Sequence, residues 1–383
     1  MEFSQETLER NTLFENVYDL KRPERVPMMV SGDNAFCLEY AGFSLKSEQY
    51  SVAKNLEAIE TASRDFDSDV VFGSILRQPQ IYSALKARNF VPGADGFIQH
   101  PEVHGMEVED YDAFIDDPYK TICDRVLPRV YGALEEGGFK AHKAFAKAFS
   151  SFITGFLQPA GEYAAIAVRT GRAVYSLATT CSPTCFDSLA DQLRSFSGIS
   201  KDIRRVPEKV EAACEAMLPL TVKAGITPMS NRYNRTFIPL HMAPYMREKD
   251  FKRFYWPTFK AYVEALDQAG VGANIMVEQD WSRYLDYLNE LPEGTALFFE
   301  YGDPKEIKER VGGRHIISGL YPLGLLKTGT QKECEDKAKE LLDILAPGGK
   351  HIFSFDKSLL RLKDVNVENL KAVLSCVKEY GKY

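Results

Sequence analysis

The amino-acid sequence predicts an α/β protein, a (β/α)8 TIM barrel with N-terminal helical additions. Two observations lead to this prediction. From residue 205 onward, short apolar strands alternate with helices of about 8–15 residues, which is typical of a parallel sheet. No glycine-rich G-x-G-x-x-G loop follows a predicted strand, so a dinucleotide-binding sheet is not expected. We therefore expect a single barrel domain over residues 1–383, with residues 1–25 forming a helical extension before it.

The helices of the second half are predicted from apolar spacing and from residues that begin or stop helices. Apolar residues near helical spacing indicate a helix over 248–269, which Pro257 kinks or splits and Gly270 ends. Asn366 is expected to cap the last helix, which ends near Gly381. The other expected helices are Pro207–Ala224, Trp281–Leu291, Pro304–Val311 and Lys332–Leu345.

Strands are predicted where short apolar runs lie between turns rich in Pro and Gly. A short strand at Gly225–Met229 is expected to lead into a polar and aromatic loop over Ser230–Tyr245. The irregular region 90–200 is expected to hold one or two further strands. The other expected strands are Val26–Val30, Asp69–Phe72, Ala273–Val277, Ala296–Phe299, His315–Ser318 and His351–Phe355.

Composition limits the classes of function. The chain carries 47 Lys and Arg against 54 Asp and Glu, a net charge of −7, whereas a nucleic-acid-binding protein needs a basic face. The most apolar stretch, residues 149–168, is interrupted by Pro159, Gly161 and Glu162, so no membrane span is expected. The polar N-terminus and the seven cysteines, which include no Cys-x-x-Cys pair, favour a cytoplasmic protein.

Chemistry is expected at the carboxyl ends of the barrel strands, where the loops that follow them converge. Glu278 and Glu300 end neighbouring strands, so their side chains are predicted to approach each other over the barrel mouth, with Asp280 nearby. Two close carboxylates either share a proton or bind a cation. We predict these three residues as catalytic. The structural alternative is that each carboxylate caps a helix or pairs with an arginine.

Aromatic and polar residues on or near the same loops indicate a pocket for a flat organic substrate. For any single aromatic residue, packing in the core is the alternative. The predicted substrate-binding residues are Tyr233, Trp281, Tyr301, Tyr321, Arg232 and Asp356.

The histidines fall into three groups. His315 and His351 begin strands and are therefore expected at the opposite end of the barrel, in structural roles. His241 lies on the loop that is predicted to face the mouth. His100 and His104 form a His-Pro-Glu-Val-His sequence, in which the proline opposes the helix that two zinc ligands at this spacing would use. We interpret that sequence as a loop motif.

Four segments resemble the uroporphyrinogen decarboxylase superfamily. They are RPERVP at 22–27, DFKRFYWP at 250–257, ISG at 317–319 and VENLKAV at 367–373. The resemblance is diffuse but covers most of the chain, and it implies a (β/α)8 barrel. The superfamily holds two broad activities: decarboxylation of the acetate arms of a porphyrinogen without a cofactor, and methyl transfer to or from a corrinoid protein.

The sequence departs from both branches at named positions. The decarboxylases carry an arginine-rich Met-Arg-Gln-Ala-Gly-Arg signature after the first strand, whereas residues 28–37 here contain no arginine to pair with substrate carboxylates. Thiol-directed methyltransferases bind zinc through a His-x-Cys pair and a later Cys. Met276 and Glu278 stand at the pair here, with Lys357 near the later position. Zinc held instead by Glu278, Glu300 and His241 is the metal site that we predict.

The methyltransferase branch, and within it an O-demethylase component of an anaerobic demethylation system, is the resemblance we favour. It implies a methyl donor that is a small molecule, such as a methoxylated aromatic, and cobalamin carried by a partner corrinoid protein. Two alternatives remain open. One is a lyase in which Arg232 or Arg235 holds a substrate carboxylate, and the other is a barrel that only binds a tetrapyrrole or corrinoid.

Overall fold

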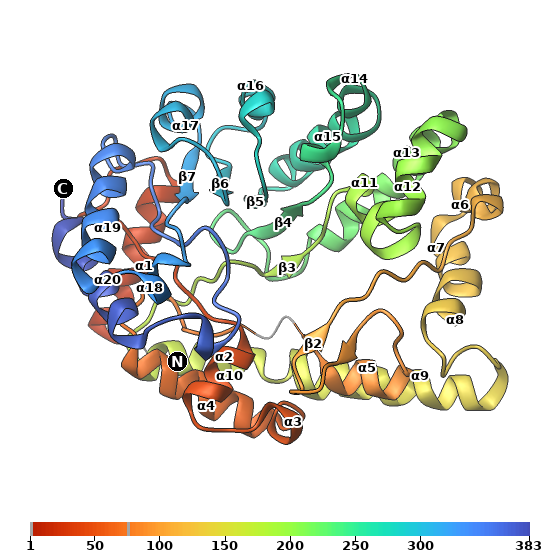
Figure 1. Cartoon of the computed structure of the whole chain (residues 1–383), viewed down its shortest axis with the longest axis horizontal. Coiled ribbons are helices and arrows are strands. Elements are labelled where there is room, and N and C mark those ends of the chain that lie inside the picture. The colour runs from red at the N-terminus through yellow and green to blue at the C-terminus, as the bar shows by residue number, and fades with distance from the viewer. Residues whose placement is uncertain (1–2, 75–76) are drawn as a thin grey trace.

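Five parallel strands form the continuous part of a central sheet in the computed structural model, which describes residues 3–74 and 77–383. The strands neighbour one another in chain order, so each new strand adds beside the previous one (Figure 1). Ile275 of β5 pairs with Ile238 of β4 and with Leu297 of β6, which sets the register. The strands are β3 (Thr180–Cys181), β4 (Thr236–Leu240), β5 (Ala273–Val277), β6 (Ala296–Phe299) and β7 (Ile316–Gly319).

Single parallel bridges continue this sheet past both edges and close it into a ring. Residues 351–355 pair with β7 on one side and with the segment around Met28 on the other. The backbone N–H of Asp69 donates to Met28, and Val70 pairs with Ala173, which lies shortly before β3. The segments predicted as strands at 26–30, 69–72 and 351–355 are therefore members of the ring, and the predicted (β/α)8 barrel is confirmed. The bridges are Ile317–His351, Tyr321–Phe355, Met28–Phe353 and Val70–Ala173.

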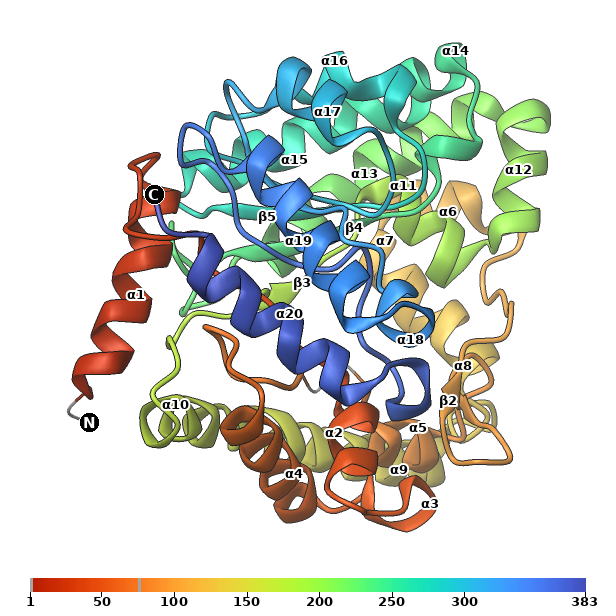
Figure 2. The same cartoon turned by 60° about the vertical axis from the view of Figure 1, so that its left-hand side comes forward.

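Helices cover the outside of the ring between successive strands (Figures 1 and 2). Thr330 and Glu333 form a reciprocal capping box at the start of α19, and Asn366 caps α20 as predicted. Pro257 is tolerated because it lies in the first turn of α15. The covering helices are α13 (Pro207–Gly225), α14 (Glu248–Asp250), η6 (Phe251–Tyr255), α15 (Trp256–Gln268), η7 (Ser282–Tyr284), α16 (Leu285–Leu288), α17 (Pro304–Val311), α18 (Leu325–Thr328), α19 (Gln331–Leu345), η8 (Leu362–Asp364) and α20 (Val367–Tyr380).

The helix α1 (Gln5–Tyr18) packs against the amino-terminal end of the barrel interior. Its residues Phe14 and Tyr18 are buried in one apolar cluster with Met29, Phe298 and Ile352, which come from three different members of the ring. Since successive strand side chains point to opposite faces, these residues define which positions of each strand face inward. Helix α1 therefore closes the amino-terminal end of the barrel, and the carboxyl end of the strands is left for chemistry.

About one hundred residues lie between the segments around Val70 and Ala173. In Figure 1 this insertion runs along one side of the barrel, and it includes a short antiparallel hairpin of β1 and β2. It holds α5 (Pro79–Leu85), β1 (Val91–Pro92), β2 (Ile98–Gln99), η1 (Val108–Asp110), α6 (Tyr111–Asp116), α7 (Pro118–Thr121), η2 (Ile122–Val126), α8 (Leu127–Val130), α9 (Gly138–Phe152), η3 (Ile153–Leu157) and α10 (Ala160–Arg169). The elements α2 (Asn34–Tyr40), α3 (Leu45–Glu48) and α4 (Val52–Asp65) precede it, and α11 (Cys185–Ser188), η4 (Leu189–Leu193) and α12 (Phe196–Arg205) follow β3.

One predicted strand is wrong. The helix α13 extends through Gly225, and residues 226–235 form the loop that leads into β4. The actual strand, Thr236–Leu240, contains Pro239, a residue that is normally confined to edge strands or bulges. The prediction therefore placed the strand too early, and it assigned residues 230–235 of the following loop to the wrong end of the barrel, whereas residues 241–245 do lie at the mouth.

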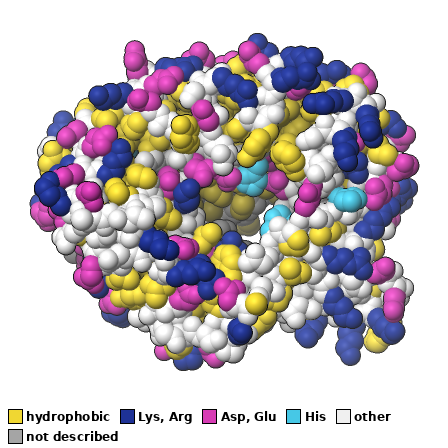
Figure 3. All heavy atoms as spheres, in the orientation of Figure 1, with side chains coloured by type: hydrophobic (Ala, Val, Ile, Leu, Met, Phe, Trp, Pro, Cys, Tyr) yellow, Lys and Arg dark blue, Asp and Glu magenta, His cyan; other side chains and the backbone are white. Residues whose placement is uncertain are grey.

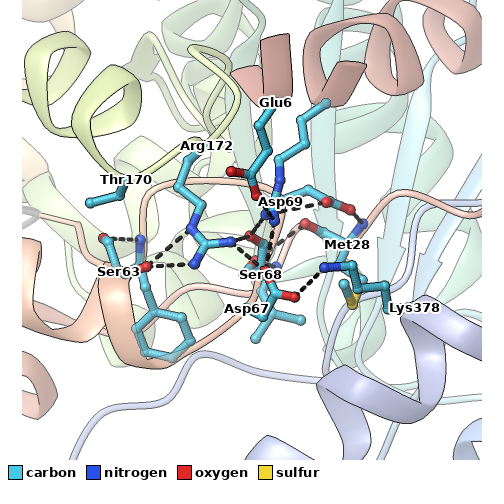
Figure 4. Close-up of polar contacts among 12 residues, drawn as sticks. Glu6, Met28, Ser63, Asp67, Ser68, Asp69, Thr170, Arg172 and Lys378 are labelled. Atoms are coloured by element: carbon cyan, nitrogen blue, oxygen red, sulfur yellow. Dashed lines mark hydrogen bonds and ion pairs between the residues drawn. The ribbon is translucent and has the colours of Figure 1, made fainter. Parts of the chain in front are cut away.

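A network of buried charges joins four parts of the chain (Figure 4). They are helix α1, the ring segment around Asp69, the residues that follow α10, and helix α20. The Asp69 carboxylate is fully buried and accepts hydrogen bonds from Arg25 and from the backbone N–H of Met28. The neighbouring Asp67 accepts from Arg10, Arg172 and Lys378 at 2.5–2.6 Å. Burial alone would raise the pKa of Asp67, but these three cations hold it well below its usual range.

Among the described residues, no helix has both the length and the apolar content needed to cross a bilayer.

Candidate active site

Four polar side chains follow the carboxyl ends of barrel strands. His241 follows β4, Glu278 follows β5, Glu300 follows β6, and Asp356 follows the paired segment 351–355. Side chains alternate along a strand, so Glu278 continues the inward-facing series of Met276. Glu300 continues the series of Phe298 in the same way, and both carboxylates therefore lie over the barrel axis.

His241 is held between two carboxylates. Its Nδ1 bonds to Asp191, and its Nε2 lies 3.1 Å from Oε1 of Glu278 on the neighbouring strand. Asp191 comes from η4, a π-helical turn in the connection between β3 and α12. Single π-helical turns are common at functional sites because they redirect one side chain out of the regular helical pattern.

The two carboxylates keep His241 protonated. Burial on its own lowers the pKa of His241, but the hydrogen bonds and charges of Asp191 and Glu278 outweigh burial and raise it to about 11. With both ring nitrogens protonated, the imidazolium donates to Asp191 through Nδ1 and to Glu278 through Nε2. A free histidine side chain is mostly neutral at pH 7. In the set Asp191–His241–Glu278 the histidine instead keeps its second ring proton, so the set holds one extra proton.

A fully buried acid, Asp187, fixes the backbone beside His241. Asp187 of α11 accepts hydrogen bonds from the N–H of Met242 at 2.8 Å and from the hydroxyl of Tyr255 at 2.5 Å. Complete burial raises the pKa of Asp187 to about 6, although the positive charge of His241 acts in the opposite direction. Asp187 touches the chain next to His241 and is a positioning residue.

Glu300 belongs to a separate set of contacts. Its Oε2 accepts the backbone N–H of Gln279 at 2.9 Å, and its Oε1 lies 3.4 Å from Nζ of Lys357. Lys357 also lies 3.8 Å from Asp356, whose other oxygen accepts the N–H of Leu323. Gln279 has φ of +60°, a left-handed conformation that costs energy for a residue with a Cβ atom. Glu278 and Glu300 are thus linked through the Gln279 backbone, each with its own cationic partner.

The predicted zinc ligands do not assemble into a ligand set. Among residues 3–74 and 77–383, no three His, Cys, Asp or Glu side chains are placed to hold a metal ion. Both nitrogens of His241 bond to carboxylates, and Glu300 bonds to Gln279 and Lys357. The residues present therefore do not fit the predicted zinc site.

Two of the predicted substrate-binding residues lie at the wrong end of the barrel. Arg232 and Tyr233 precede β4, and both contact Asp19 at the end of α1. The alternative carboxylate-binding residue Arg235 lies there too, where its guanidinium donates to three backbone carbonyls and stacks over Tyr18. These predictions fail because they depended on the misplaced strand at 225–229.

The predicted aromatic residues divide between core and rim. Trp281 is fully buried between aromatic rings of η6 and η7, and Tyr321 is fully buried with its hydroxyl bonded to the carbonyl of Cys334. Both belong to the core rather than to a pocket. Tyr301 follows Glu300 and is 62% exposed. Asp280 accepts hydrogen bonds from Ser282 and lies beside the mouth.

The region around these side chains is hollowed. Figure 3 shows a depression at the centre of the molecule with histidine and acidic side chains at its edge. Beside it, a cleft of about 430 Å³ lies next to Gln279 and contains the exposed ring of Tyr245. A cleft of this size accommodates a small organic ligand. Its lining is Pro244, Tyr245, Gln279, Asp280, Ser282 and Arg283.

Comparison with known proteins agrees with this architecture. The family model described as Uroporphyrinogen decarboxylase (URO-D) matches residues 169–380, which is more than half of the chain. The chain belongs to the uroporphyrinogen decarboxylase family. Among solved structures, a methyltransferase from Methanosarcina mazei superposes with a TM-score of 0.60 over 99% of both chains, at 14% sequence identity. At this identity the likeness concerns the fold alone. No curated protein matches the sequence.

Proposed function

We propose that this protein is a methyltransferase that takes a methyl group from a small methylated donor, a methoxylated aromatic, and passes it to the cobalt of a partner corrinoid protein. The observation that carries the proposal is the hydrogen-bonded set Asp191–His241–Glu278 over the barrel mouth. Membership of the uroporphyrinogen decarboxylase family and the fold shared with a methyltransferase support it.

Demethylation of an aryl methyl ether needs a proton at the ether oxygen. The bond from the methyl carbon to the ether oxygen breaks, and its electron pair stays on the oxygen. The product is a phenolate, which is a poor leaving group. The corrinoid of the partner, when bound, supplies cobalt(I), whose electron pair forms the new bond to the methyl group. This chain must then deliver one proton to the oxygen. General acid catalysis of this kind contributes roughly 10²–10⁴-fold in rate.

The histidine set provides that proton. His241 holds it on Nε2 against Oε1 of Glu278, and Glu278 is only partly buried, so its carboxyl group reaches the open mouth. The proton passes from His241 through Glu278 only as the ether oxygen becomes a phenolate, because the Glu278 carboxylate by itself leaves the proton on His241. Asp191 keeps the second ring proton on Nδ1 and so holds the imidazole in one orientation, as a carboxylate does in hydrolase triads.

The charges at the mouth favour this activity over decarboxylation of a polycarboxylate. Arg77 is paired with Asp33, and Arg361 is paired with Glu39, so both arginines are already neutralised by the chain itself. A substrate with several carboxylates needs free guanidinium groups for bidentate pairing. Among the residues that line the cleft, Arg283 alone carries a guanidinium group, which is too few for such a substrate.

The rim of the mouth fits a flat macrocycle. Tyr245 and Tyr301 follow β4 and β6, and each ring is 62% exposed. Exposed aromatic rings bury large areas against planar ligands at little entropic cost. A corrinoid laid over this rim would close the hollow from outside while the donor occupies it from within.

A screen of methyl donors with free cob(I)alamin tests the proposal. Methoxylated aromatics, methanol and methylamines are each mixed with the enzyme and cob(I)alamin, and methylcobalamin is followed by its absorbance. We expect turnover with methoxylated aromatics. Turnover with none of the donors, combined with tight binding of cobalamin, would favour the alternative of a binding protein. Metal analysis of the active preparation addresses zinc directly.

A further inference from the structure

Three rings form a stack in the insertion beside the mouth. Tyr82 lies over Phe90 with ring centroids 4.6 Å apart and planes inclined by 14°. Phe90 in turn lies over His100, with centroids 4.5 Å apart and planes within 3° of parallel. His100 is the exposed end of this stack. One face of its imidazole is therefore covered by Phe90, and the other face has no ring upon it among the described residues.

The stack lies beside the proton-delivering set. Burial lowers the pKa of His100, the charge of Asp191 raises it, and the charges of His241 and Arg77 lower it again. The loop that carries His100 packs against the elements around Asp191. The backbone N–H groups of Gly105 and Met106 donate to the carbonyl of Leu193, which lies two residues after Asp191 in η4, and the N–H of Ser197 donates to Glu102 at 3.0 Å. His100 therefore lies on the same side of the mouth as Asp191 and His241, although it comes from a loop 141 residues earlier in the chain than His241.

His100 is suited to an uncharged ring. Because its pKa is lowered, the imidazole is neutral at pH 7, and it does not present a cation to a ligand. A neutral imidazole carries one N–H donor and one nitrogen acceptor at its edge. Neither nitrogen hydrogen-bonds to another described residue, and both point outward in the plane of the ring, so the open face offers a ligand stacking contact without a charge.

We propose that the open face of His100 is the platform on which the aromatic ring of the methyl donor stacks, with Tyr82 and Phe90 as its rigid support. The inference rests on the proposed function and makes it more specific. The donor is a neutral planar ring with oxygen substituents, and its ether oxygen is directed toward Glu278 and His241. An aliphatic methyl ether of the same size lacks the flat face that the platform recognises.

Binding of guaiacol, measured by calorimetry without any corrinoid, tests the platform separately from methyl transfer. Wild type is compared with His100→Ala, which removes the platform, and with His100→Phe, which keeps a flat ring. His104→Ala is the matched control, because His104 is a half-exposed neighbour that contacts Glu107. Cyclohexyl methyl ether serves as the non-planar ligand.

The expected pattern is specific. His100→Ala should weaken guaiacol binding about 3–10-fold, in line with the usual strength of aromatic stacking, while His100→Phe stays within about 3-fold of wild type. His104→Ala should bind as wild type does, and cyclohexyl methyl ether should bind at least about 10-fold more weakly than guaiacol. Equal binding by wild type and His100→Ala, or no binding of guaiacol by wild type, overturns the platform.

The outcomes separate the two proposals. If guaiacol binding depends on His100 but no methylcobalamin forms, the platform stands and the methyltransferase proposal fails. If methyl transfer from guaiacol proceeds with the same KM in His100→Ala as in wild type, the methyltransferase proposal stands and the platform fails.

Discussion

The Oε1 atom of Glu278 lies 3.1 Å from Nε2 of His241, and the two residues follow neighbouring parallel strands. In the pairing of β4 with β5, Leu240 lies opposite Val277. The next residues along the two strands, His241 and Glu278, therefore lie opposite each other at the strand ends. Their contact is therefore a direct result of strand pairing, and it needs no long loop to bring it about. The proton-delivery proposal depends on this contact.

Replacing Glu278 with Gln should abolish methyl transfer and leave folding intact. The amide keeps the shape of the side chain but cannot pass a proton from His241 to the leaving oxygen. We expect a loss of at least about 100-fold in kcat, the lower end of general acid effects. Methylcobalamin formation and the thermal midpoint are measured together. The control is Glu293→Gln, the same change in an exposed turn before β6. Full activity in Glu278→Gln would remove Glu278 from the mechanism.

Replacing Asp191 with Asn should lower the pKa of His241 below its value of about 11. The pKa of His241 is about 11 in the folded protein, above its value of 6.5 in the unfolded chain. The pairing of His241 with its carboxylates therefore stabilises the protein fully below about pH 6.5, and this stabilisation is lost as the pH rises through about 11. In Asp191→Asn that loss should occur at lower pH. Imidazole NMR titration reports the pKa, and denaturation at pH 7 and pH 10 reports the stability. An unchanged titration would show that Asp191 does not hold the proton.

The strands that carry the two predicted carboxylates were predictable, because each is a short apolar run between Pro- or Gly-containing turns. Both β5 and β6 agree with their predicted bounds. The positions of Asp191, which bonds to His241, and of His100, on the same side of the mouth, were not predictable. They lie 50 and 141 residues before His241, in irregular connections where no periodic pattern indicates which side chain returns to the mouth.

The predicted meeting of Glu278 and Glu300 shows a second limit of pattern reasoning. Strand ends place both carboxylates at one mouth, but they do not indicate what each side chain bonds to. His241 reaches Glu278 and Lys357 reaches Glu300, so each acid has a cation of its own. The left-handed backbone at Gln279, which directs its N–H to Glu300, has no signal in residue type, because glutamine rarely adopts that conformation.

Replacing Asp69 with Asn should destabilise the fold by about 3–5 kcal/mol, the usual cost of breaking a buried ion pair. Asp69 is fully buried and neutralises Arg25, which is itself mostly buried. The amide would leave that guanidinium without a counter-charge. Chemical denaturation measures the free energy of unfolding. In the control, Glu57→Gln, the exposed pair with Lys54 is lost, and a change below about 1 kcal/mol is expected. Equal effects of the two variants would contradict the role given to the buried network.

Replacing Gly319 with Ala should disturb both stability and the site. Gly319 ends β7 with φ of +82°, and an added Cβ would lie 2.3 Å from the carbonyl oxygen of Phe299. Because that contact is with backbone, relief requires β6 to move, and Glu300 follows Phe299 directly. We expect destabilisation of about 1–3 kcal/mol, typical of overpacking. We also expect reduced methyl transfer, because the movement shifts Glu300 and its bond to Gln279.

Gly313→Ala is the control, since an added Cβ there meets nothing within 4 Å. A Gly319→Ala protein as stable and as active as Gly313→Ala would show that the close approach of β6 and β7 does not hold Glu300 in place.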